Sequence, residues 1–204
     1  MVGPVPPPVG GVENFTVAIL ESPQLTEFDI LHCNLTKGRP KQTQGKFDIG
    51  NARWALIHFK RLSRLIDKSK PDLVYMPVTG TWAGFFRDSV LSKIVRKRNV
   101  KVIGHVHGGW FNRILEATGW KSKIVRKTLN RFDMLLVLGT PWLKELKNYG
   151  FKGKLAIVPA TTRAEVFDAG EKHQHNYTDF GHGLFLGQVG KRKGSLTCSK
   201  HCLN

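Results

Sequence analysis

The sequence is poor in cysteine and acidic residues, and it has no long apolar run. Its 204 residues include 3 cysteines, at positions 33, 198 and 202. These are too few and too scattered for a disulfide framework, so we expect free thiols in a reducing compartment. No run approaches the roughly 18 apolar residues of a membrane-spanning helix. Residues 1–15 lack the basic and apolar regions of a secretory signal. We therefore expect a cytoplasmic protein.

Basic residues far outnumber the acidic ones. The chain has 32 Lys and Arg against 15 Asp and Glu, a formal net charge of +17. Such an excess attracts nucleic acid, an anionic membrane face or phosphorylated ligands. Basic runs occur at 93–101, 121–127 and 191–193. They lie on different predicted elements and no nucleic-acid motif accompanies them, so we do not expect a nucleic acid partner. A peripheral contact with the anionic inner face of a membrane stays open.

Short apolar runs alternate with stretches of helical period. Strands are predicted at 72–77, 101–107, 133–138 and 154–158, and helices at 52–66, 89–99, 111–132 and 140–149. This order is typical of βαβ units. The sequence therefore predicts an α/β, Rossmann-like fold with a mostly parallel sheet and helices on both faces.

Two of the predicted helices carry further local signals. In 52–66 the buried face is expected to include Leu56, Leu62 and Ile66, with basic residues opposite. In 140–149 Thr140 is the expected N-cap, and Gly150 is the expected C-cap. Both helices are therefore predicted to cover a parallel sheet.

Ligands of parallel sheets bind beyond the carboxyl ends of the strands. The segments that directly follow the predicted strands are 78–84, 107–110, 139–140 and 160–163. Candidate ligand-binding residues are therefore expected in these four segments.

A loop rich in proline and glycine lies near the amino terminus, GPVPPPVGGV at residues 3–12. Adjacent Gly10 and Gly11 before a helix would let backbone amides approach a phosphate. The alternative is a mobile proline-rich tail. Only Met1 and Val2 precede Gly3, so no strand is expected before this loop.

Two histidines, His105 and His107, stand two positions apart in a predicted strand and should point to the same side. A metal site is conceivable, but no third ligand lies at a suitable spacing. His107 is nearer the carboxyl end of the strand, where it could hydrogen-bond a ligand, whereas His105 suits a buried position. Arg87 could contact a phosphate or pair locally with Asp88.

Several of these pieces, in their order and spacing, resemble the amino-terminal domain of a family 4 glycosyltransferase of the GT-B fold. They are GPVPPPVGGV, KPDLVYM, GFFRDS, KVIGHVHGGWF, DMLLVLGTPWLKELKNYGF, KLAIVPATT and LFLGQVGKRKG. The resemblance implies a Rossmann-like acceptor-side domain at residues 1–165. It also implies a linker at 166–183 and the start of a nucleotide-sugar-binding domain at 184–204.

The family transfers a sugar from a nucleotide-sugar to an acceptor with retention at the anomeric carbon, and without a metal or other cofactor. The resemblance implies a lipid-linked or polysaccharide acceptor in cell-surface glycan biosynthesis. By resemblance, Gly10 and Gly11 would approach the donor diphosphate and His107 would face the transferred sugar. Arg87 would line the acceptor side, and Lys193 would bind donor phosphate.

The sequence also departs from the family. Gln188 stands where a phosphate-binding arginine is usual, and nothing after Gly194 supplies the family's paired glutamates. We therefore expect little or no transferase activity from this chain alone. The alternative hypothesis is a non-catalytic module that binds a membrane or a partner protein.

Overall fold

The computed structural model describes residues 1–36, 49–108 and 110–159. All of them belong to a compact unit that spans Met1–Arg163. The predicted linker, the predicted second domain and Lys193 lie outside the described residues. Their boundaries and roles stay predictions.

The larger sheet is parallel, with strand order β3-β4-β5-β6. These strands are β3 (Leu73–Val78), β4 (Lys101–Val106), β5 (Met134–Val137) and β6 (Lys154–Ile157). Each coincides with a predicted strand to within one residue at either end. The sequence predicts them well because each is a short, largely apolar run. Strands β3, β4 and β5 carry buried residues, whereas β6 at the edge of the sheet has none.

Helices connect these strands. They are α3 (Trp82–Arg96), α4 (Asn112–Leu115), α5 (Gly119–Leu129) and α6 (Thr140–Tyr149). Helix α3 begins seven residues earlier than predicted, because the polar residues and the glycines in 78–84 indicate a loop. Thr140 is the first residue of α6 and Gly139 is its N-cap, so the predicted Thr140 cap is wrong. Gly150 ends α6 with φ +85°, a conformation that glycine adopts easily, and that prediction is confirmed.

The amino-terminal part adds β1 (Val2–Gly3), α1 (Gly11–Leu20), the 3₁₀ helix η1 (Pro23–Leu25), β2 (Cys33–Asn34) and α2 (Ile49–Ser69). Strands β1 and β2 pair in parallel, with Val2 opposite Cys33. The expectation that no strand precedes the loop at residues 3–12 is therefore wrong. Two residues are too few to show a periodicity. Backbone hydrogen bonds and burial of Val2 nevertheless fix β1.

The buried face of α2 differs from the prediction. Leu62 and Ile66 are buried as expected, but Leu56 is 59% exposed and His58 is buried instead. Successive residues of an α-helix are about 100° apart around its axis. Leu62, six residues after Leu56, therefore points about 120° away from it. The face that packs on the core therefore follows the steps of four from His58 to Leu62 and Ile66.

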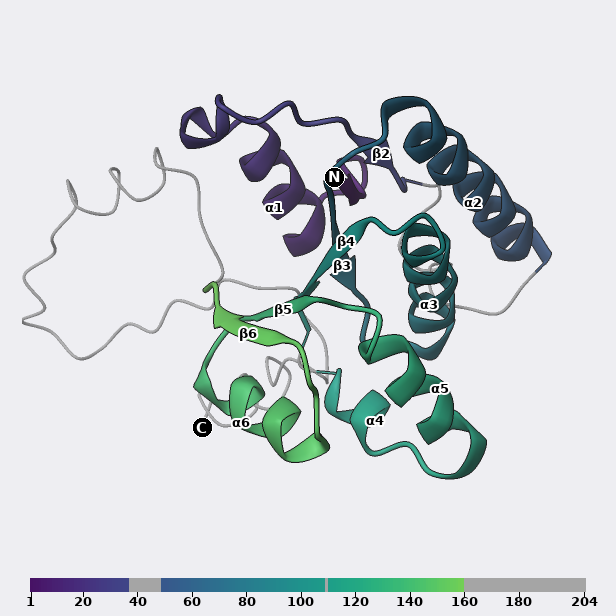
Figure 1. The fold of residues 1–204 in the computed structure, drawn as a ribbon, viewed down its shortest axis with the longest axis vertical. Coiled ribbons are helices and arrows are strands. Elements are labelled where there is room, and N and C mark those ends of the chain that lie inside the picture. The colour runs from purple at the N-terminus through teal and green to yellow at the C-terminus, as the bar shows by residue number, and fades with distance from the viewer. Residues whose placement is uncertain (37–48, 109, 160–204) are drawn as a thin grey trace, which may run out of the picture. The chain divides into compact units, whose positions relative to one another are not determined.

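Strand β1 packs beside β3. The chain continues from β1 to β2 on one side and from β3 to β4 on the other, so the strand order reverses between β1 and β3. In Figure 1, α1 lies on one side of β3 and β4, whereas α2, α3 and α5 lie on the other. The structure thus confirms an α/β, Rossmann-like fold. Such a switch point opens a crevice at the carboxyl ends of the strands, which is where ligands of this fold class bind.

Candidate active site

Two histidines meet at the carboxyl end of β4. The ring centroids of His105 and His107 are 3.9 Å apart, so both side chains point to the same side of the sheet, as predicted. The hydroxyl of Tyr75, on β3, lies 2.8 Å from Nδ1 of His105 and 3.5 Å from Nε2 of His107. A tyrosine hydroxyl can donate one hydrogen bond and accept another. Tyr75 therefore orients both imidazole rings.

Burial keeps both imidazoles neutral. Burial, and to a smaller extent the electrostatic effect of His105, lowers the pKa of His107 to about 3. Burial also lowers the pKa of His105 to about 4, opposed by a backbone hydrogen bond with Val158. At neutral pH each ring therefore carries one N–H donor and one acceptor nitrogen. His107 is suited to hydrogen-bond a hydroxyl group rather than to neutralise an anion.

Helix α1 brings the predicted phosphate-binding glycines to the same place. The ring of Phe15 meets the rings of His105 and His107 edge-on, with centroids 4.9 and 4.7 Å apart. Phe15 lies one turn into the helix that starts at Gly11. The amino end of α1 and the histidine pair therefore belong to one region of the molecule, which the sequence alone could not show.

The backbone at this helix start suits an anion. Gly10 is the N-cap in an extended conformation, and no described side chain caps the helix. The amides of a first helical turn have no partner within the helix, and they carry its positive end. A side chain added at Gly11 would meet nothing within 4 Å. The space beside Gly11 is therefore open to a ligand.

Arg87 is engaged within its own helix. It donates from Nε and Nη2 to Oδ1 of Asp88, at 2.9 and 2.7 Å, and from Nη2 to the hydroxyl of Thr79 at 3.1 Å. The other carboxylate oxygen of Asp88, which is fully buried, accepts the backbone N–H of Thr79 at 2.8 Å. Arg87 thus fixes the loop after β3. Its role on the acceptor side stays a prediction.

The loops after β3 and β4 touch each other. A side chain at Gly80 would lie 3.0 Å from the backbone of Trp110 and Phe111, so only glycine allows this approach. The guanidinium of Arg113 lies 4.0 Å from the centroid of the Trp110 ring. Two of the segments predicted to bind ligands, 78–84 and 107–110, are thereby brought together. The third, 139–140, follows β5, and 160–163 lies outside the described residues.

The sequence did not point to two residues of this region, Tyr75 and Phe15. Both contact the histidines, and they come from different elements. The alternation of β3 marks Tyr75 as sharing one face with Pro77, which is a weak signal. Their contacts depend on strand register and helix packing.

The comparison with protein families agrees with this arrangement. The family model described as Glycosyltransferase Family 4 matches residues 9–161, well over half of the chain. No curated protein matches the sequence.

Proposed function

Because the chain belongs to glycosyltransferase family 4, we propose that it supplies the acceptor-side half of a retaining sugar-transfer site. The donor would be a nucleotide-sugar, and the acceptor a lipid-linked glycan or polysaccharide of the cell surface. One observation carries the proposal: the open amino end of α1 and the neutral His107 lie together at the carboxyl edge of the sheet.

The chemistry follows from these two features. In the transfer, the bond between the anomeric carbon and the donor diphosphate breaks, and a bond to an acceptor hydroxyl oxygen forms on the same face of the sugar. The acceptor hydroxyl gives its proton to the departing diphosphate. The departing diphosphate gains negative charge, which the amides of Gly11 and the next residues can stabilise. His107 would hydrogen-bond a hydroxyl of the transferred sugar and orient it. In this proposal, Lys193 adds a cation to the diphosphate, and no metal takes part.

The acceptor-side domain alone is expected to transfer sugar slowly. A site built between two domains positions its donor and excludes water only when both halves are present. Donor binding is therefore a better first readout than transfer, because the amides of α1 and the His107 ring already lie together in the described residues.

Equilibrium dialysis of the full chain against radiolabelled nucleotide-sugars tests the donor site. We expect weak binding of at least one donor that persists in excess EDTA. Gly11→Val, which fills the open space, and His107→Ala should each weaken it about tenfold or more, with unchanged melting temperatures. Failure of the wild type to bind any donor would contradict the proposal. Binding by both variants as tight as that of the wild type would also contradict it.

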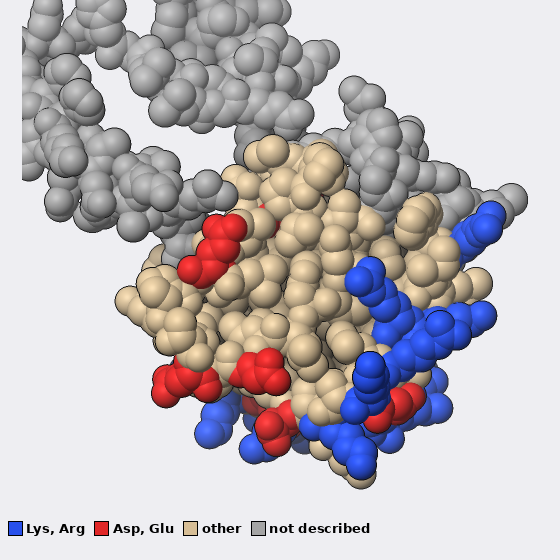
Figure 2. All heavy atoms as spheres, turned by 90° about the horizontal axis from the view of Figure 1, so that it is seen from above, with Lys and Arg blue, Asp and Glu red and all other residues tan. Residues whose placement is uncertain are grey.

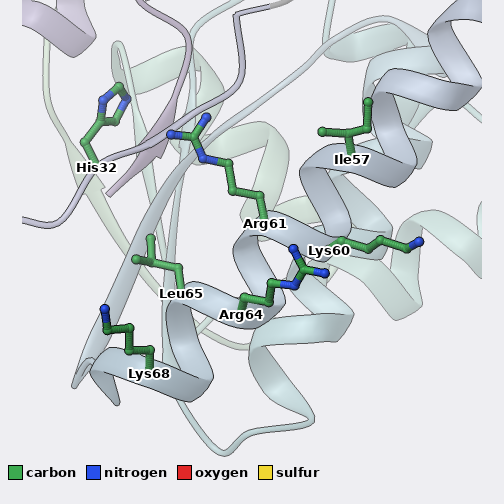
Figure 3. Close-up of a pocket in the computed structure, with 7 residues that line it drawn as sticks. All are labelled: His32, Ile57, Lys60, Arg61, Arg64, Leu65 and Lys68. Carbon is green, nitrogen blue, oxygen red and sulfur yellow. The ribbon is translucent and has the colours of Figure 1, made fainter.

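The membrane contact has a specific candidate on α2. A groove of about 560 Å³ is lined by His32, Ile57, Lys60, Arg61, Arg64, Leu65 and Lys68. Figure 3 shows Arg61 reaching from α2 towards the segment that carries His32. Lys and Arg gather on the right of the face in Figure 2, the side on which α2 lies in Figure 1, and acidic side chains lie mostly towards the left.

These groove cations are available to an anionic surface. Lys60, Arg61, Arg64 and Lys68 form no ion pair with an acidic residue in the described part of the chain. Leu56 and Ile57 are exposed on the same helix. Within the described residues, no helix is both long and apolar enough to cross a membrane. We therefore propose that α2 holds the protein peripherally on anionic phospholipid at the inner membrane face.

A further inference from the structure

Three aromatic side chains form an aromatic platform on α3 and α5, defined as Trp82, Phe86 and Trp120. The ring centroids of Phe86 and Trp120 are 6.3 Å apart, and the rings are nearly parallel at 19°. Trp82 and Phe86 are 5.8 Å apart at 39°. Trp120 is 62% exposed. Trp120 therefore presents a flat aromatic surface to water at the junction of two helices, beside the half-buried rings of Trp82 and Phe86.

The platform is held rigidly from beneath. Trp82 packs edge-on against Phe85, with centroids 6.3 Å apart, and Phe85 packs against Phe111 at 6.4 Å. Both Phe85 and Phe111 are fully buried. Two core residues thus fix the Trp82 ring before any ligand arrives, which lowers the entropic cost of binding.

The platform lies at the edge of the sheet where His107 lies. Trp82 is the first residue of α3, which follows β3, and Trp120 is the second residue of α5, which follows β4 and α4. A helix that connects two parallel strands begins at the carboxyl edge of the sheet. Phe111, which anchors the platform, belongs to the same loop as Trp110. The platform therefore lies at the same carboxyl edge as the candidate active site, with its helices on the face of the sheet opposite α1 (Figure 1).

A cation stands beside the rings. Nζ of Lys121 lies 5.1 Å from the centroid of the Trp82 ring and 5.7 Å from that of Trp120. Ring faces carry negative potential and attract both cations and polarised C–H groups. A pyranose presents one face of C–H groups and a rim of hydroxyls. The rings match its face, and the ammonium of Lys121 can donate to its rim.

We infer that the aromatic platform binds a pyranose ring of the acceptor glycan, with Trp120 stacked on the C–H face of the sugar and Lys121 donating to a hydroxyl or carboxylate at its rim. This inference rests on the proposed transfer of a sugar to a glycan acceptor. It assigns acceptor specificity to three aromatic residues and one lysine outside the donor site. The preference for rings over acyl chains follows from the flat, aromatic surface and its adjacent cation.

Saturation-transfer NMR of the full chain with methyl glycosides of glucose, galactose, mannose and glucuronic acid tests the inference. At least one glycoside should receive saturation at the C–H protons of one ring face. Trp120→Ala should weaken that binding about tenfold, whereas Trp120→Phe should keep part of it. Phe28→Ala is the matched control, because Phe28 is also an exposed aromatic residue, at 59%, outside the platform. It should leave binding unchanged.

Several outcomes would overturn the inference. The first is that no glycoside binds, and the second is that Trp120→Ala and Phe28→Ala behave alike. The third is that geranyl phosphate, and not the glycosides, perturbs Trp120, which would assign the platform to an isoprenoid chain. Donor dialysis of the same samples separates the two proposals. Donor binding without glycoside binding would contradict only the platform, and glycoside binding without donor binding would contradict only the donor site.

Discussion

The carboxyl edge of the sheet and the groove on α2 offer anions two different environments. At the sheet edge the histidines are neutral, His105 buried and His107 half-buried, and the attraction comes from backbone amides at the start of α1. In the α2 groove the attraction comes from solvated lysine and arginine side chains. The first environment suits one ligand in one orientation, because amides are fixed in direction. The second suits a fluid surface, because long cationic side chains adapt.

The difference also shows why net charge is a poor guide to the active site. The groove on α2 accounts for four cations, but the proposed donor site is built from glycines and neutral histidines. Coulombic attraction in water is weak and screened by salt. In a buried site a few fixed dipoles have a larger effect.

The largest expected contrast is between the buried ion pair at the sheet edge and the exposed pair on α2. Asp88→Ala leaves Arg87 and the Thr79 amide without their partner, so the free energy of unfolding should fall by about 3 kcal/mol. Asp67→Ala removes the exposed ion pair with Arg98. This should change the free energy of unfolding too little to measure. Urea denaturation of both variants checks this. Equal losses would show that the sheet edge is no more rigid than α2.

Acid should affect the two regions differently. The folded-state pKa values of His105 and His107 lie below the ordinary histidine value, so the unfolded chain binds more protons than the folded chain between about pH 6.5 and pH 4. The stabilisation of the folded state by the two neutral histidines is therefore complete above about pH 6.5. Below that pH the free energy of unfolding falls by about 1 kcal/mol per pH unit for each histidine.

Urea midpoints measured from pH 7.5 to pH 4 test this dependence. His107→Gln should flatten the profile, whereas Arg64→Gln in the groove should leave its slope unchanged. A profile for His107→Gln that is as steep as that of the wild type would contradict the assigned burial.

The smallest contrast concerns the membrane. Arg64→Glu and Lys60→Glu should each weaken binding to vesicles of anionic phospholipid by about 1 kcal/mol or more at low salt. Neither should alter nucleotide-sugar binding at the sheet edge. Vesicle sedimentation over a salt series measures the effect, with Lys144→Glu on α6 as the control. If both groove variants bind the vesicles as tightly as the wild type, α2 is excluded as the membrane contact.

Much of the fold follows from local sequence. Strands β3 to β6 are short apolar runs between polar residues. Gly150 marks the end of α6, because few other residues adopt its backbone conformation. His107 could be singled out because a strand end before paired glycines is a usual ligand position. These features depend on neighbouring residues only.

Other features depend on contacts between distant elements. Strand β1 has two residues and is held by its pairing with Cys33 and Asn34. The orientation of His107 depends on Tyr75 and Phe15, which come from another strand and from α1. The sequence left Arg87 with two alternatives, a phosphate contact or a local pair with Asp88. The structure shows the local pair, because the buried carboxylate needs a partner.

The most direct test of the account is a titration of the isotopically labelled full chain with a nucleoside diphosphate, followed by NMR. We predict that the backbone amides of Gly11 and Val12 and the imidazole of His107 shift together with one dissociation constant. Lys60, Arg61 and Arg64 should shift little and only at low salt. Shifts confined to α2, with the amides of α1 unchanged, would contradict a donor site at the carboxyl edge of the sheet.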